Sequence, residues 1–252
     1  MRTAMTASPH AIESASLLDT NRRFYDGLWR DAQLIDPRRF NTWPLVESLL
    51  AQAPRRLEIA PGLRPRLPVA GTAFVDVSAP ALRQLRAHDG HAVQALADAL
   101  PYADASFDLV CAFDIVEHIA GDEAAMAELA RVARPGAVML LSVPLHAASW
   151  TVFDEFVGHY RRYEPDALLA LIAAHGFALE RSAVHGMQPK STWLLKLGMW
   201  FLEHDRERAM WWYNRVLMRF ALGAQPPLAF EPGMIATDGV DTVLLVCRKA
   251  AS

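Results

Sequence analysis

The sequence predicts an α/β protein with a mostly parallel β-sheet covered by helices on both faces. Between Arg55 and residue 185, short apolar runs alternate with helical stretches, an order typical of βαβ units with right-handed crossovers. One run, Leu57–Ala60, contains a single carboxylate, Glu58, and breaks at Pro61-Gly62, as a buried strand does when it enters a tight turn. In open α/β sheets, ligands bind beside such turns at the carboxyl ends of strands.

Seven strands and five helices are expected outside a late insert. The strands are Leu57–Ala60, Ala73–Val77, Ala92–Ala97, Phe107–Phe113, Ala137–Val143, Ala178–Val184 and Thr242–Cys247. The helices are Asp19–Trp29, Arg38–Gln52, Ala81–His88 with Ser78 as its cap, Asp122–Arg131 and Pro165–His175. Pro65 and Pro68 fall where the first crossover helix should run, so we expect that helix to be one turn or irregular.

Two regions are expected along the chain. Residues 1–54 hold a loose tail and two helices, and residues 55–252 form one ligand-binding domain. An insert at about 186–238, between the last two strands, contains two apolar helical stretches, Thr192–Glu203 and Arg206–Leu222. We expect these stretches to form a helical lid over an apolar pocket.

Composition excludes several classes of protein. The 252 residues are 52% hydrophobic and 21% charged, which suits a globular chain with a large core. The net charge of −3 gives no reason to expect a nucleic-acid partner. The sequence contains no run of 18 uncharged apolar residues, so no transmembrane helix is predicted. The N-terminus lacks the apolar segment of a secretory signal. With Cys111 and Cys247 in apolar runs and no CxxC pair, we expect a cytoplasmic protein.

Five short motifs, in order, resemble those of the class I S-adenosylmethionine (SAM)-dependent methyltransferases, in particular the small-molecule type 11/12 group. They are Glu58-Ile59-Ala60-Pro61-Gly62-Leu63-Arg64, Asp76, Asp98-Ala99-Leu100-Pro101, Phe107-Asp108 through Glu117-His118, and Arg131-Val132-Ala133-Arg134-Pro135-Gly136. The resemblance covers about residues 40–185 and 240–249. It implies a Rossmann-like seven-stranded sheet whose last strand is antiparallel.

The resemblance also implies a SAM site. Gly62 lets the backbone approach the ligand, Asp76 accepts hydrogen bonds from the ribose hydroxyls, and Asp98 meets the adenine. For Asp98, a helix cap or turn remains an equal alternative. The expected cofactor-binding residues are Glu58, Ala60, Gly62, Asp76, Val77, Asp98, Ala99, Leu100, Phe113 and Asp114.

Two positions depart from the glycine-rich first motif. Ala60 and Arg64 stand where the family has glycines. These departures predict either weaker cofactor binding or an Arg64 side chain that points outward or meets a carboxylate. A nicotinamide dinucleotide site is a poorer fit, because it needs several glycines against the pyrophosphate.

Histidines supply the candidates for chemistry. Methyl transfer from a sulfonium depends mainly on alignment, and an acceptor with a labile proton benefits from a base. His159 and His118 are the expected catalytic residues. His146, Tyr160, Arg161 and Arg162 are expected to bind the substrate. Alternatively, His159 and the arginines pair with Asp154 and Glu155 and staple the loop.

Asp114-Ile115-Val116-Glu117-His118 resembles the metal-binding segment of some RNA and ubiquinone-pathway methyltransferases, where a further His completes the site. Glu-His is also common in members without metal, and we expect no metal here.

The predicted function is methylation of oxygen or nitrogen on a small, largely apolar metabolite, with SAM as cofactor. The alternative is a SAM-binding scaffold without methyl transfer, either a partner subunit or a cyclase-like enzyme. In the insert, Arg208, Trp212, Arg215 and Arg219 share one helical face, which is either solvated or contacts a membrane surface. A homodimer is also compatible with the sequence.

Overall fold

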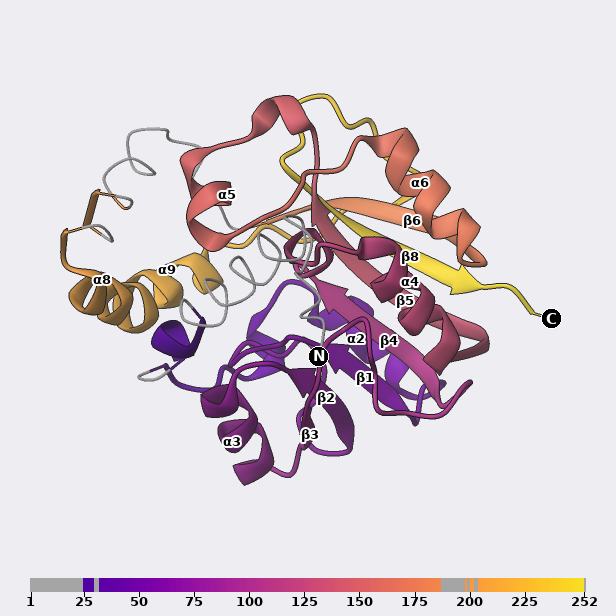
Figure 1. Cartoon of the computed structure of the whole chain (residues 1–252), viewed down its shortest axis with the longest axis horizontal. Coiled ribbons are helices and arrows are strands. Elements are labelled where there is room, and N and C mark those ends of the chain that lie inside the picture. Colours follow the sequence, from indigo (N-terminus) through magenta and orange to yellow (C-terminus); the bar gives the residue numbers. More distant parts are fainter. Residues whose placement is uncertain (1–24, 30–31, 187–197, 199, 202–203, 252) are drawn as a thin grey trace, which may run out of the picture.

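An eight-stranded sheet in the order β3-β2-β1-β4-β5-β8-β6-β7 forms the centre of the computed structural model (Figure 1). The structure describes residues 25–29, 32–186, 198, 200–201 and 204–251. The strands are β1 (Arg56–Ile59), β2 (Thr72–Asp76), β3 (His91–Gln94), β4 (Phe107–Phe113), β5 (Ala133–Pro144), β6 (Phe177–His185), β7 (Glu231–Pro232) and β8 (Thr242–Lys249).

The direction of the strands confirms a mostly parallel sheet. The strands β3, β2, β1, β4 and β5 pair in parallel, whereas β8 is antiparallel to both β5 and β6. The expected seven strands become eight because the two-residue strand β7 pairs antiparallel with the edge of β6. The chain leaves β1 for β2 on one side and reaches β4 on the other, so the order reverses beside β1, where α/β proteins bind ligands.

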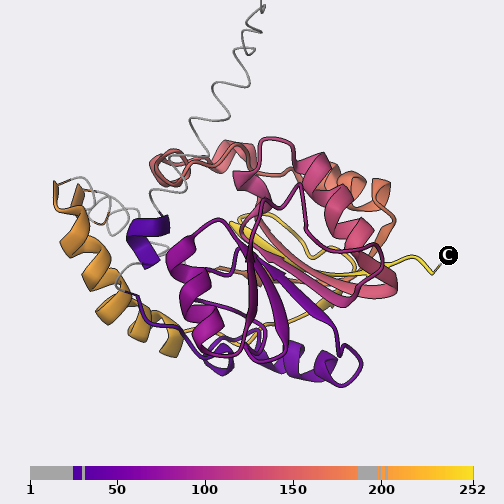
Figure 2. The same cartoon turned by 60° about the horizontal axis from the view of Figure 1, so that its bottom comes forward.

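Helices cover both faces, as predicted. Apolar side chains of α4 (Asp122–Val132) and α6 (Pro165–Ala174) pack on the face that carries Leu57, Val110 and Met139. The opposite face holds α2 (Trp43–Leu50), which packs on Leu109 and Leu140, and α3 (Ala79–Ala87), which packs on Phe74. Figure 2 shows α6 and α2 on opposite sides of the sheet.

Several boundaries differ from the sequence prediction. The helix expected over Arg38–Gln52 is wrong in its first part: a 3-10 turn, η1 (Pro37–Arg39), comes first, and α2 begins only at Trp43. Phe40 separates them because its backbone is extended, with ψ of 145°, and Pro44 suits the first turn of the new helix. β3 ends at Gln94 rather than Ala97, and β5 already begins at Ala133, where its pairing with β4 shifts register.

The described part of the insert is helical up to Gly223 and then continues as a loop that contains the short strand β7. α8 (Arg206–Trp212), the π-helical turn η4 (Tyr213–Leu217) and α9 (Met218–Gly223) follow one another without a break, which confirms the stretch predicted over Arg206–Leu222. The stretch predicted over Thr192–Glu203 and the tail of residues 1–16 lie largely or wholly outside the described residues. Among the described helices, none combines the length and apolar character needed to span a membrane.

Candidate functional site

The loop from β1 to β2 contains no helix, as the prolines predicted, and is held by the buried carboxylate of Glu58. This side chain points to the α2 face of the sheet and accepts backbone N–H bonds from Arg66 and Leu67 at 2.9–3.0 Å. Leu63 and Leu67 of this loop are fully buried, so the loop fills the space that a crossover helix would take. Burial raises the pKa of Glu58 to about 7, against the lowering effect of these hydrogen bonds.

Ala60 and Gly62 give the same loop its sharp turn. Both have positive φ angles, 50° at Ala60 and 55° at Gly62. Glycine adopts this conformation freely, whereas alanine pays a steric cost there of about 1–2 kcal/mol. Ala60 therefore adopts a backbone conformation that glycine prefers, at some cost in strain.

Asp76, at the end of β2, links this turn to the next helix. Its Oδ2 accepts the Gly62 N–H at 2.9 Å, and its Oδ1 accepts the Ser78 N–H at 2.7 Å. A carboxylate has about four lone pairs, so these bonds leave it capacity for ligand hydroxyls. Burial raises the pKa of Asp76 to about 6 despite the backbone hydrogen bonds.

The described part of the helix predicted over Asp19–Trp29, residues 25–29, covers this turn, and the sequence did not indicate it as part of the site. The Trp29 indole lies so close to Gly62 that a Cβ built there would meet its ring carbon at 2.2 Å. Ser78 occupies the predicted cap position of α3, but its hydroxyl donates to Asp26 at 2.8 Å instead of capping the helix. Tyr25 lies 3.3 Å, hydroxyl to Nε2, from His118. No motif marked this helix as part of the site, because its contacts reach residues 33 to 186 positions away.

Arg64 points toward helix 25–29 and the insert. Its guanidinium donates to the Tyr213 hydroxyl and to Asn214 Oδ1, both at 3.1 Å. It also lies over the rings of Trp29 and Tyr213, at 5.1 and 4.8 Å from their centroids. Arg64 thus joins the β1–β2 loop to helix 25–29 and to the insert.

The remaining expected cofactor residues lie along the same edge in different surroundings. Asp98 and Ala99 are exposed in a turn after β3, and Leu100 is buried in the core with its N–H donating to Glu128 at 2.7 Å. Val77 is half-buried, and its carbonyl accepts from Gln94.

Phe113 and Asp114 end the neighbouring strand β4. Phe113 packs toward α2. Asp114 is exposed with φ of 49°, and its carboxylate accepts a bond from the Ser142 hydroxyl at 2.8 Å.

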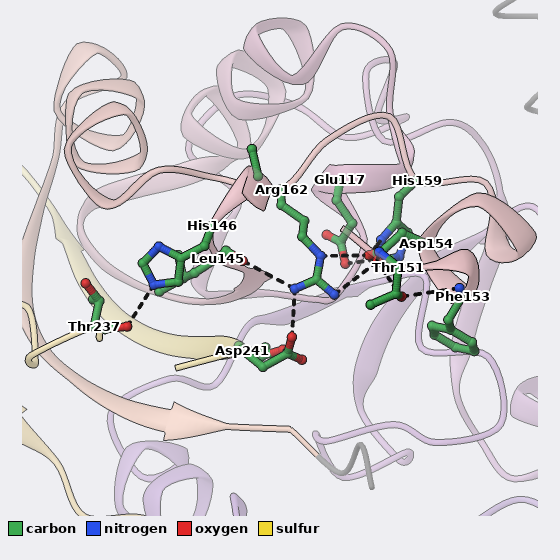
Figure 3. A network of polar contacts seen from close by, with 12 residues as sticks. Glu117, Leu145, His146, Thr151, Phe153, Asp154, His159, Arg162, Thr237 and Asp241 are labelled. Atoms are coloured by element: carbon green, nitrogen blue, oxygen red, sulfur yellow. Dashed lines mark hydrogen bonds and ion pairs between the residues drawn. The ribbon is translucent and has the colours of Figure 1, made fainter. Parts of the chain in front are cut away.

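A second group of residues gathers beyond β4 (Figure 3). Glu117 and His118 lie in the 3-10 turn η2 (Val116–His118), and His159 follows the helix α5 (Val152–Val157). The His118 and His159 rings meet edge to face with centroids 4.4 Å apart, and His159 Nε2 is 4.0 Å from Glu117 Oε1. Burial is the main reason why the pKa of Glu117 lies well above its usual value, and the charge of Asp114 raises this pKa further. Burial is the main cause that lowers the pKa of His118 to about 3, and the neighbouring His159 ring lowers it further. The His118 imidazole is therefore neutral.

Asp154 organises this region, although the sequence identified it only as a pairing partner. Its carboxylate bonds His159 Nδ1 at 2.8 Å and receives two bonds from Arg162, at 3.0 and 3.1 Å (Figure 3). Arg162 is fully buried and also reaches Asp241 at 2.7 Å. Burial alone would raise the pKa of Asp154, but hydrogen bonds from His159, Arg162 and Thr151 hold this pKa well below its usual value.

The other predicted substrate residues do not join this cluster. Arg161 pairs with Asp122 at 2.5 Å, at the start of α4. His146 turns toward the other end of the loop, where its Nε2 contacts the Thr237 carbonyl at 2.7 Å (Figure 3). Tyr160 donates its backbone N–H to the Glu117 carbonyl at 2.8 Å.

A separate cleft of about 580 Å³ lies on the α2 side of the molecule. It is lined by residues of η1, α2, the 225–230 loop and β6, including Arg39, Trp43, Arg181 and Phe230. None of the predicted cofactor or catalytic residues lines it, so it is distinct from both groups described above.

Comparison with known proteins agrees with this geometry. Residues 62–141 match the family model described as a methyltransferase domain. No curated protein gave a significant match to the sequence.

Solved structures share the fold at low sequence identity. The cyclase SpnF aligns over 100% of both chains with a TM-score of 0.57 and 16% identity. A SAM-dependent methyltransferase from Thermotoga maritima aligns over 84% of this chain and 91% of its own, with a TM-score of 0.53 and 15% identity. One from Mesorhizobium loti covers 85% of this chain and 100% of its own, with a TM-score of 0.50 and 13% identity. The chain therefore has the class I SAM-dependent methyltransferase fold, and its residues 62–141 are recognised as a methyltransferase domain.

Proposed function

We propose that the chain binds SAM at the carboxyl edge of β1 and β2 and transfers its methyl group to an oxygen or nitrogen atom of a small, largely apolar metabolite. The observation that carries this proposal is the contact between Asp76 and the positive-φ turn at Gly62. It supports a carboxylate fixed at the strand end, where the ribose hydroxyls of a nucleoside ligand are bound in α/β proteins. Glu58, Ala60 and Val77 shape this edge, while Asp98, Ala99 and Leu100 border its adenine end.

Cofactor entry requires helix 25–29 to move. Trp29 covers Gly62, and the Asp26 carboxylate accepts a hydrogen bond from the Ser78 hydroxyl. In the proposal this helix shifts away from the turn as SAM enters. Phe113 and Asp114, at the end of β4, border the path between the cofactor and the acceptor.

The acceptor is assigned to the apolar side of the same edge. Leu28, Trp29, Val157 and Met210 form one cluster, with Phe153 and Phe156 packed against it. These side chains come from helix 25–29, α5 and α8, which together surround the approach to His159. An apolar lining with a few polar groups is typical of pockets for small metabolites.

His159 and His118 are the proposed groups that act on the acceptor. Asp154 holds the His159 ring, which directs Nε2 toward Glu117. The contacts of Arg161, Arg162 and His146 with Asp122, Asp154 and Thr237 support a positioning role for these three residues, and Tyr160 holds the same loop against η2.

The alternative, a SAM-binding scaffold without methyl transfer, is favoured by one comparison. The cyclase SpnF aligns over the full length of both chains, so the fold also accommodates a protein that is named for another reaction. The strained Ala60 and the covering Trp29 agree with an altered cofactor site.

Methyl transfer is tested with SAM labelled in its methyl group and the metabolite pool extracted from the source organism. The proposal predicts a labelled product together with stoichiometric S-adenosylhomocysteine. Bound SAM with no labelled product would instead support the scaffold.

A further inference from the structure

A buried carboxylate and two imidazoles meet at the loop after α5. Glu117, His118 and His159 each offer one ligand atom, and these atoms all lie within 4.8 Å of one another. Glu117 and His118 are buried, and the His159 side chain is only 8% exposed. Such a convergence of nitrogen and oxygen donors is the usual form of a metal site.

Within the described residues, the Glu117 carboxylate accepts no hydrogen bond, although His159 Nε2 lies 4.0 Å from it. Both of its carboxylate oxygens, and also Nδ1 of His118, are buried without a hydrogen bond. Buried polar groups are almost always bonded, and an unpaired buried carboxylate is costly. The nearby cation Arg162 is already bonded to Asp154 and Asp241. Glu117 therefore has a place for a cation that no described side chain fills.

The positions need only a small adjustment. Ligand atoms about 2.1 Å from a tetrahedral cation are about 3.4 Å apart. Glu117 Oε1 and His159 Nε2 are 4.0 Å apart. To reach coordination range, the Glu117–His159 pair would contract by roughly half an ångström and the widest pair of the cluster by up to about 1.4 Å.

Asp154 supplies the outer support that metal-binding imidazoles have. Its carboxylate lies 2.8 Å from His159 Nδ1, so this nitrogen is assigned the proton and Nε2 keeps its lone pair on the Glu117 side. A carboxylate behind a metal-bound histidine fixes its tautomer and strengthens it as a ligand. His118 contributes a second imidazole, whose Nδ1 is buried without a hydrogen bond.

We infer that Glu117, His118 and His159 form a binding site for one divalent transition-metal cation. Two imidazoles and one carboxylate are a ligand set for Zn²⁺ or Fe²⁺, whereas Mg²⁺ prefers oxygen ligands. The expectation of no metal rested on how common Glu-His is in family members without metal; the structure brings His159 to this pair, whereas Asp114 bonds Ser142. If the proposed methyl transfer is correct, an open position on the cation would hold the acceptor oxygen; the binding of the cation itself does not depend on that function.

The test is calorimetry of the full chain with ZnCl₂ after dialysis against a chelator. We expect one Zn²⁺ per chain and at least tenfold weaker binding in Glu117→Gln and in His159→Gln. His175→Gln is the matched control, because His175 also contacts a carboxylate, Glu123, at 2.8 Å but lies outside the cluster; it should bind Zn²⁺ as the wild type does. Circular dichroism checks that each variant is folded.

Co²⁺ substitution provides a second readout. Visible absorption bands of nitrogen-coordinated Co²⁺ are expected in the wild type and in His175→Gln, and should be lost in Glu117→Gln. Absence of stoichiometric Zn²⁺ binding, unchanged binding in both cluster variants, or a clear preference for Mg²⁺ would each overturn the assignment. The first result would leave Glu117 as a protonated buried acid. SAM binding is measured in the same samples, so loss of the cation site and loss of the cofactor site are distinguished.

Discussion

Glu58 is a buried acid whose protonation depends on the fold. Its pKa rises to about 7 in the folded chain from an ordinary value of 4.5, mainly because of burial. Since the folded pKa is the higher one, the stability that this group contributes is present below pH 4.5 and is lost as the pH rises through about 7.

Glu58→Gln should therefore reduce the loss of stability between pH 4.5 and pH 7. At about 1.4 kcal/mol per pKa unit, the difference between variant and wild type should change by about 2–4 kcal/mol over that window. Urea unfolding at both ends of the window measures it. Identical pH profiles for the two proteins would contradict the assigned pKa of Glu58.

Arg161 and Arg162 are neighbours in sequence with different surroundings. Arg162 is fully buried between Asp154 and Asp241, whereas the Arg161 side chain is 27% exposed beside Asp122. Removing one partner of a buried ion pair leaves the other charge unpaired. A pair near the surface is screened by solvent.

Arg162→Met should therefore destabilise the chain by about 3–5 kcal/mol. Arg161→Met, as the matched control, should cost about 1 kcal/mol or less. Equilibrium urea unfolding of both variants gives the comparison. Equal losses would show that the Asp154 network does not hold the loop after α5.

At the scale of elements, helix 25–29 covers the turn at Gly62, where the cofactor is proposed to bind. Trp29 lies on Gly62, and the Leu28 carbonyl accepts a bond from Asn214 of the insert at 2.9 Å. The helix, the β1–β2 loop and the insert thus contact one another directly.

Trp29→Ala should increase the rate of SAM association several-fold, because it removes the ring that covers Gly62. Trp200→Ala is the matched control, since Trp200 is 54% exposed and stacks on His204. Stopped-flow fluorescence with SAM measures both rates. An unchanged or slower rate in Trp29→Ala would contradict the role of helix 25–29 as a cover.

The sequence predicted those elements that have a local signal. The apolar runs of β1, β2, β4 and β8 and the prolines of the β1–β2 loop are local features, and their outcomes agree with prediction. Strand β7 has two residues and pairs only because β6 lies beside it. Phe40 interrupts the expected helix through its extended backbone, in a stretch where η1 and α2 meet.

The candidate site divides in the same way. Asp76 follows a recognisable strand, so its place beside Gly62 could be expected. The Glu117–His159 contact joins positions 42 residues apart, and Arg162 reaches Asp241 across 79. Such pairs depend on the packing of α5 and the loop after β5, which spacing in the sequence does not determine.

At the scale of the whole molecule, the insert presents an apolar surface beside basic residues. Trp211, Trp212, Leu217 and Phe220 are 42–73% exposed, while Met210 and Met218 bury the opposite side of the helix. Arg208 and Arg215 are exposed along the same stretch. Aromatic side chains with nearby arginines are typical of helices that lie on membrane surfaces.

This face should bind vesicles that contain anionic lipid more strongly than vesicles of zwitterionic lipid alone. Replacing Trp211, Trp212 and Phe220 together by alanine should reduce the bound fraction several-fold in a flotation assay. Val184→Ala, at another exposed apolar residue, should have no effect. Equal binding by the triple variant would exclude this face as a membrane contact.

The central claim is that SAM binds at the edge formed by Gly62 and Asp76. Isothermal titration calorimetry of the full chain with SAM tests it most directly, with Asp76→Ala as the site variant and Asp166→Ala, an exposed residue of α6, as the control. The account predicts one SAM per chain, binding weakened by about 1–3 kcal/mol in Asp76→Ala, and unchanged binding in Asp166→Ala. No binding by the wild type at high micromolar SAM, or equal affinity in the Asp76 variant, would contradict it.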